Sequence, residues 1–151
     1  MSNKISTAAA EAALAAIKAG LDGGNAHIFS GPVPADAADA LGGSHTLLAT
    51  LSLDGVGGGL TFAAPTGTLL PKTPTEEWVG EVLASGTPTF FRFTEAGDNP
   101  TSAGSGSYRL QGTAGGPSSS ADMRLGADSL TANGTNTVGV PIFNVRLSAF
   151  V

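Results

Sequence analysis

The chain has 151 residues, a net charge of −5 and no cysteine, and charged residues make up only 13% of it. A domain of this size buries a core without disulfides or metal, and the lack of cysteine excludes disulfides, thiolate zinc sites and cysteine nucleophiles. The acidic balance argues against nucleic-acid binding, which needs a basic face, and no stretch reaches the length of a membrane span. With 41% hydrophobic residues and 22 glycines, the composition favours a compact β protein rich in turns over disorder.

Residues 4 to about 20 predict the helix of the chain. Alanine, the best helix former, fills most of this stretch. Asn3 or Ser6 is placed to cap its start, and Gly20 lies near its end. Because the apolar stripe is narrow, the helix must pack on the sheet or on a neighbouring subunit. The stripe has spacings of three and four and consists of Leu14, Ile17 and Leu21.

From residue 26 onward the sequence predicts eight or nine short strands separated by turn-forming residues. The candidate strands are 26–30, 46–53, 60–63, 77–83, 89–94, 108–113, 123–125, 128–131 and 142–151. Leu48 breaks the alternation of its strand, 36–41 is at most one helical turn, and 132–137 is a turn around Asn133 and Gly134. This pattern predicts a mainly β fold, an antiparallel β-sandwich or jelly-roll-like single domain with an N-terminal α-helix. We expect a helical arm over 1–24 and the β-sandwich domain over 25–151.

The densest hydrophobic signal lies in the predicted strand 89–94. Alternation places Phe91 and Phe93 on one face, where we expect them in the core with residues such as Trp78 and Val145. Phe90 and Arg92 are left on the opposite face, which a soluble monomer would rather not expose. The sequence therefore predicts that Phe90 and Arg92 form part of a subunit interface, together with the helix stripe.

The four arginines, Arg92, Arg109, Arg124 and Arg146, all lie within predicted strands on the face opposite the main apolar set. Scattered charges that keep the protein soluble are one interpretation. If several cluster on one sheet face, the alternative is an interface with an acidic partner.

Other polar residues give no catalytic, cofactor or metal signature. His27 and His45 lack the spaced carboxylates of a metal site and are expected to be ordinary edge histidines. Asp122 and the serines before it have no nucleophile elbow or histidine beside them. The glycine-rich stretches lack a phosphate-loop lysine, and the carboxylates are expected on a solvated rim. These stretches and carboxylates are 55–59, 104–106, Glu76, Glu77, Glu95 and Asp98. Asn133 opens a glycosylation-like triplet, but no secretory signal accompanies it.

Several segments in this order resemble a group of small proteins encoded among the virion structural genes of tailed phages and prophages. The segments are IFSGPVP at 28–34, TLLA at 46–49, LTF at 60–62, PTFFRF at 88–93 with GDN at 97–99, RLQGT at 109–113, GGPSSSAD at 115–122 and NVRL at 144–147. The resemblance covers nearly the whole chain from residue 26 onward. Its motifs are strands and turns, so they mark a lineage and carry over no catalytic residue.

The resemblance implies a structural virion protein, most of all a capsid decoration, or cement, protein that binds across capsomer junctions. Its expected partners are the major capsid protein and copies of itself, as a dimer or trimer, on the capsid surface after synthesis in the host cytoplasm. A tail, collar or head-fibre subunit is the alternative. A carbohydrate-binding or depolymerase module is more remote, because one tryptophan and one tyrosine make a thin stacking platform.

The helical arm leads to a prediction of its own. If residues 1–24 anchor the protein to a neighbour, their deletion should leave a folded β domain that associates more weakly. A truncated chain that fails to fold would place the helix in the core instead.

Overall fold

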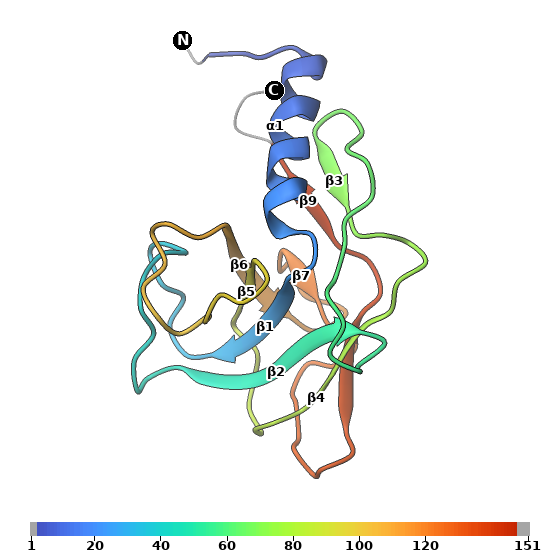
Figure 1. Cartoon of the computed structure of the whole chain (residues 1–151). Helices are drawn as coiled ribbons and strands as arrows, with labels where there is room; N and C mark the ends of the chain where they lie inside the picture. The colour runs from blue at the N-terminus through green and yellow to red at the C-terminus, as the bar shows by residue number, and fades with distance from the viewer. Residues whose placement is uncertain (1–2, 148–151) are drawn as a thin grey trace.

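The computed structural model describes residues 3–147, and these form a mainly β protein with one N-terminal helix (Figure 1). The elements in chain order are α1 (Thr7–Leu21), β1 (Asn25–Ser30), β2 (Thr46–Leu53), β3 (Leu69–Pro71), β4 (Trp78–Glu81), β5 (Phe90–Thr94), β6 (Arg109–Gly115), β7 (Met123–Arg124), β8 (Thr137–Val140) and β9 (Asn144–Arg146). The predicted fold class, mainly β with an N-terminal helix, is confirmed.

Seven strands form one sheet in the order β7-β6-β5-β1-β2-β4-β8, and β3 pairs with β9 in a small second sheet. All pairs are antiparallel except β6 with β7, which run parallel. The large sheet curls until its edges approach, and Gly126, just after β7, donates its N–H to the carbonyl of Gly139 in β8 at 3.1 Å. The sheet is therefore nearly closed into a barrel, and we call the line where the β7 edge meets the β8 edge the seam. One curled sheet thus supplies both of the layers that a sandwich would build from two.

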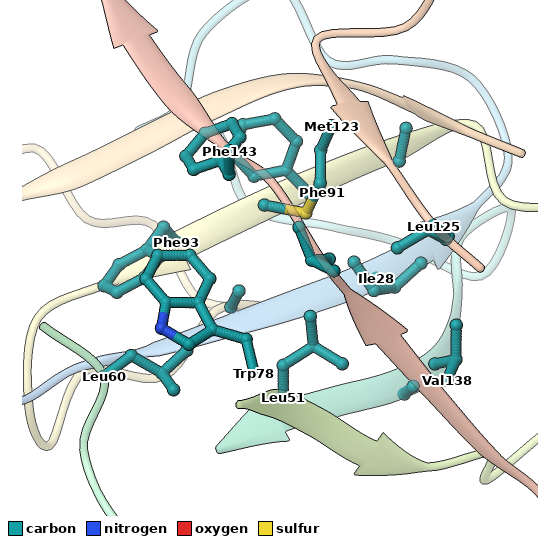
Figure 2. Close-up of a cluster of buried hydrophobic side chains, with 14 of the residues drawn as sticks. Ile28, Leu51, Leu60, Trp78, Phe91, Phe93, Met123, Leu125, Val138 and Phe143 are labelled. Atoms are coloured by element: carbon teal, nitrogen blue, oxygen red, sulfur yellow. The ribbon is translucent and has the colours of Figure 1, made fainter. Parts of the chain in front are cut away.

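The core fills the inside of this curled sheet with aromatic and branched side chains. The ring of Trp78 lies 5.6 Å from that of Phe93, and the ring of Phe91 lies 5.3 Å from that of Phe143, measured between centroids. Figure 2 shows both pairs, with Met123 beside Phe91. The predicted core role of Phe91 and Phe93 is confirmed, and Val145 belongs to the same buried cluster.

Helix α1 begins where the Ser6 hydroxyl accepts a hydrogen bond from the Ala9 N–H at 3.2 Å, as expected of an N-cap. It stands at one end of the barrel, beside β3 and β9 (Figure 1). Leu14 and Leu21 are fully buried in the core, whereas Ile17 is partly buried against it. The helix therefore packs on its own chain, the first of the two arrangements that its narrow stripe required.

Most predicted strands are confirmed, with ends that shift by one or two residues. Two stretches contribute only isolated bridges: 60–63 through Leu60 and Phe62, and 128–131 through Leu130. β3 and β8 are strands that alternation did not reveal, and 36–41 forms turns and bends. Of the long run predicted at 142–151, only β9 is a strand, and 148–151 lies outside the described residues.

The exception at Leu48 has a structural cause. Ile28 pairs with Ala49 but Phe29 pairs with Leu47, so Leu48 is an extra residue on β2 at a bulge. The bulge shifts the alternation, and Leu48 is fully buried while Leu47 is only half-buried.

Candidate binding site at the seam of the barrel

The outer face of β1, β5 and β6 is the face on which Phe90 and Arg92 were expected to be exposed. Both side chains have a relative exposure of 0%. Two segments, 31–45 and 95–107, cover this face, and they are joined to each other by backbone hydrogen bonds from Leu41 to Thr101 and from Gly104 to Ala38. In Figure 1 they lie together at one side of the barrel. The expectation of an exposed Phe90 and Arg92 was therefore wrong, because the chain covers its own outer sheet face.

Arg92 holds the two covering segments against the sheet. One terminal guanidinium nitrogen donates to the carbonyls of Asp39 and Pro100, both at 2.8 Å. The other terminal nitrogen and Nε donate to Gln111 Oε1 at 2.7 and 3.1 Å, with a longer contact of 3.4 Å to the Asp36 carbonyl. Burial, followed by the nearby Arg109, lowers the pKa of Arg92 from its ordinary value.

Arg109 adds a second attachment on the same face. Its guanidinium makes a two-point ion pair with Asp98, at 2.6 and 2.9 Å, and donates to the carbonyls of Ala37, Asn99 and Ser102. The hydrogen bond from Arg109 holds the pKa of Asp98 below its ordinary value, although burial acts in the opposite direction. Arg92 and Arg109 are therefore internal structural groups and neither solubilising charges nor interface charges.

His27 lies in the middle of the sheet rather than at an edge. Its ring nitrogens are hydrogen-bonded to the hydroxyls of Thr50 and Thr94, both at 3.1 Å. Burial lowers the pKa of His27 to about 4. His45 holds one covering segment in place, because its Nδ1 accepts from the Gly42 N–H and its Nε2 donates to the Pro32 carbonyl.

Glu76 corrects the expectation that the carboxylates form a solvated rim. Its carboxylate accepts hydrogen bonds from the N–H and hydroxyl of Thr61 and from the indole N–H of Trp78 at 2.9 Å. Burial alone would raise the pKa of Glu76, but these hydrogen bonds outweigh it and the pKa is lowered. Trp78 itself is 1% exposed, so the single tryptophan belongs to the core and offers no stacking surface.

The helix stripe and the turn residues give no exposed site either. Leu14 and Leu21 are in the core, so a partner on α1 would meet the rest of the helix surface. Ser119 donates its hydroxyl to the Gly116 carbonyl, as expected of a loop serine. Within residues 3–147, no three histidine, aspartate or glutamate side chains gather as metal ligands would, and no helix has the length and apolar character needed to cross a bilayer.

A cleft of about 780 Å³ lies beside the seam, and we call it the seam cleft. One wall comes from β6, β7 and the loop between them, and the other from the segment 141–146. The lining of the cleft includes Gln111, Asp122, Arg124, Phe143, Asn144 and Arg146.

The floor of the seam cleft is apolar and its rim is polar. Phe91 and Phe143 meet edge to face at the floor, with Leu125 and Val145 also lining the cleft. At Gly112 an added Cβ would come within 2.9 Å of both Phe91 and Asp122, so this position needs glycine. Ile142, 74% exposed, extends the apolar lining outward.

Electrostatically the cleft differs from the acidic chain as a whole. Arg124 and Arg146 are exposed on its lining, and within residues 3–147 neither makes an ion pair. Asp122 is the one carboxylate on the lining, and its Oδ2 accepts from the N–H and hydroxyl of Thr113 at 2.9 Å each. The arrangement can hold a ligand that combines an apolar part with an anionic group.

The sequence pattern singled out Arg124 and Arg146, but it did not show that the two side chains lie on the same cleft. They lie 22 positions apart along the chain, and only the curl of the sheet places both on one cleft. No local sequence signal pointed to the cleft, because a single exposed apolar residue such as Ile142 is common on protein surfaces.

Comparison of the chain with protein-family models, with the curated proteins and with the solved structures found no match.

Proposed function

We propose that this protein is a structural component of a tailed-phage virion, and that it decorates the head by binding the major capsid protein across capsomer junctions. The resemblance of the segments from residue 26 onward to phage virion proteins motivates the proposal. The proposal includes the assignment of the fold to the sandwich or jelly-roll class, because capsid decoration proteins are commonly small β-rich domains.

The observation that carries a binding role is the seam cleft. It combines an exposed apolar lining with two arginines, and one oxygen of its single carboxylate, that of Asp122, accepts hydrogen bonds from Thr113. General acid–base catalysis needs a group positioned to exchange a proton with a substrate. The cleft instead offers groups that recognise shape and charge, which supports a docking surface.

The covered outer face supports the same role. Arg92 and Arg109 fix two long segments by hydrogen bonds to their carbonyl groups, and within the described residues every buried side-chain nitrogen and oxygen has a partner. Segments held in this way keep their shape when the protein is mounted on a particle, which suits a structural subunit.

Counting and locating the protein in purified virions tests the proposal. Quantitative mass spectrometry should find hundreds of copies per particle, and electron cryomicroscopy should place them on the outside of the head. A handful of copies on the tail would favour the tail, collar or fibre alternative, and absence from virions would overturn both.

A further inference from the structure

On the first wall of the seam cleft, β6 has an edge that no strand among residues 3–147 pairs at Gln111. The Glu95 N–H donates to the Tyr108 carbonyl and the Ala114 N–H to the Thr89 carbonyl, so even-numbered residues of β6 face β5. In an antiparallel ladder the residues between them point their N–H and C=O groups to the other side. On that side β7 pairs only with Ala114 and Gly115. The N–H and C=O of Gln111 therefore point toward the cleft.

The opposite wall has the same character. The Lys72 N–H donates to the Phe143 carbonyl at 2.8 Å, and the Leu147 N–H to the Thr68 carbonyl at 2.9 Å, so odd-numbered residues of β9 face β3. The backbone groups of Asn144 and Arg146 point the other way, and both residues line the cleft. Within the part of the chain that the structure describes, two strand edges without a neighbouring strand thus border one cleft.

Charge indicates what kind of chain would fit between these edges. The cation pairs among residues 3–147 are Lys18 with Asp22 and Arg109 with Asp98, while Arg92 and Lys72 are buried. The cations left exposed and without an ion pair in this range are Lys4, Arg124 and Arg146. Two of these three lie on the seam cleft, in a protein of net charge −5.

We propose that the seam cleft binds an extended, acidic segment of a neighbouring polypeptide by strand addition. The segment donates and accepts main-chain hydrogen bonds at Gln111 on one side and at Asn144 and Arg146 on the other. Its alternate apolar side chains rest on Phe91 and Phe143, and its carboxylates meet Arg124 and Arg146. This inference rests on the proposed function only for the identity of the neighbour. The binding of an acidic strand can be measured with the purified protein, whether or not the protein is part of a virion.

Binding of synthetic peptides to the full-length protein tests the inference. The probe is a fluorescein-labelled seven-residue peptide that alternates valine and glutamate, measured by fluorescence anisotropy at low salt. A matched peptide carries lysine in place of glutamate, and two others carry N-methyl groups on alternate amides, one set for each side of the strand. We expect saturable binding of the acidic peptide and its loss in all three controls, with amide shifts at Gln111, Asn144 and Arg146 in NMR spectra.

Protein variants identify the cations. Arg124→Gln and Arg146→Gln should each weaken the acidic peptide about threefold, as for an exposed ion pair, and the double variant about tenfold. Lys4→Gln removes the same charge from an exposed residue off the cleft and should leave affinity unchanged. Equal loss in Lys4→Gln would reduce the effect to overall charge and overturn the proposal.

The other outcomes are equally decisive. Absence of saturable binding by the acidic peptide overturns the inference, as does undiminished binding of the N-methylated peptides, which would make the cleft a simple anion site. Neither result bears on the number of copies in virions, so the proposed function would still be judged by that separate count.

Discussion

Arg92 carries a positive charge into a fully buried position without a carboxylate among its hydrogen-bond acceptors. A guanidinium has five N–H donors, and Arg92 makes hydrogen bonds to Gln111 and to the carbonyls of Asp36, Asp39 and Pro100 that use all of them. Gln111 is held in turn, because its Nε2 donates to the Pro34 carbonyl at 2.9 Å. The covering segments therefore depend on the geometry of the guanidinium as well as on its charge.

Arg92→Lys should lower the free energy of unfolding by about 2–4 kcal/mol. Lysine keeps the charge but has three donors on one atom, so several buried carbonyls lose their partner. Chemical denaturation of the purified variant measures the loss. Arg124→Lys is the matched control, because that side chain is exposed, and we expect a change within about 0.5 kcal/mol. Equal effects in the two variants would contradict this role of Arg92.

His27 should make stability fall on mild acidification. Burial lowers its pKa to about 4, below the ordinary value of 6.5. The folded state therefore disfavours the protonated ring, so the contribution to stability is complete above pH 6.5 and is lost as the pH falls toward 4. Between pH 7 and pH 5 the linkage amounts to about 2 kcal/mol. Denaturation of the wild type and of His27→Gln at both pH values measures the difference, and equal pH dependence in both would contradict it.

Single residues show which part of the core the sequence could reveal. Phe91, Phe93 and Trp78 follow a period of two within strands, so their common face was predictable. The burial of Phe90 and Arg92 was not, because segments 31–45 and 95–107 have the composition of turns. No local pattern shows that two such segments will pack over a sheet and satisfy a guanidinium there.

At the scale of elements, prediction succeeded where a repeating pattern was long enough. β2 and β5 alternate over five residues or more and were found, whereas β3 has only three residues, the last of them Pro71, and β8 contains Gly139. The helix was clear from its alanines, but its partner was not. Leu14 and Leu21 pack as well on a sheet of the same chain as on a neighbour, and only the fold decides between them.

Helix α1 should be part of the folding unit. Leu14 is fully buried, Glu11 accepts from the Gly67 N–H at 2.8 Å and Asp22 accepts from the Phe62 N–H at 2.9 Å. Leu14→Ala should cost about 2–4 kcal/mol of unfolding free energy, because it leaves a cavity in the core. Ile17→Ala, at a partly buried position of the same helix, should cost less, and thermal melts compare the two.

Removal of residues 1–24 extends the same test. This packing argues against the separable arm predicted from the sequence, so we expect the truncated chain to lose its cooperative unfolding transition and its near-ultraviolet circular dichroism. A truncated protein that keeps both, and associates more weakly with its partner, would restore the anchoring arm.

At the scale of the whole molecule, the fold class was readable but the closure was not. Short strands with turns between them predict a mainly β domain. The parallel pairing of β6 with β7 and the approach of Gly126 to Gly139 depend on strand order, which alternation does not encode. The seam cleft follows from that order, so the sequence named Arg124 and Arg146 without showing that they share a site.

The seam should be the part of the barrel that opens first. β1 is hydrogen-bonded along its length to β2 and β5 at the centre of the sheet, whereas among residues 3–147 the edges of β7 and β8 are joined by the backbone hydrogen bond from Gly126 to Gly139. Amides protected by few bonds at an edge exchange through local opening, whereas central amides exchange only through global unfolding. Hydrogen exchange followed by NMR should show the Gly126 amide exchanging at least ~100-fold faster than that of Ile28. If both exchange at the same slow rate, the seam is as firmly closed as the centre of the sheet, and this prediction is wrong.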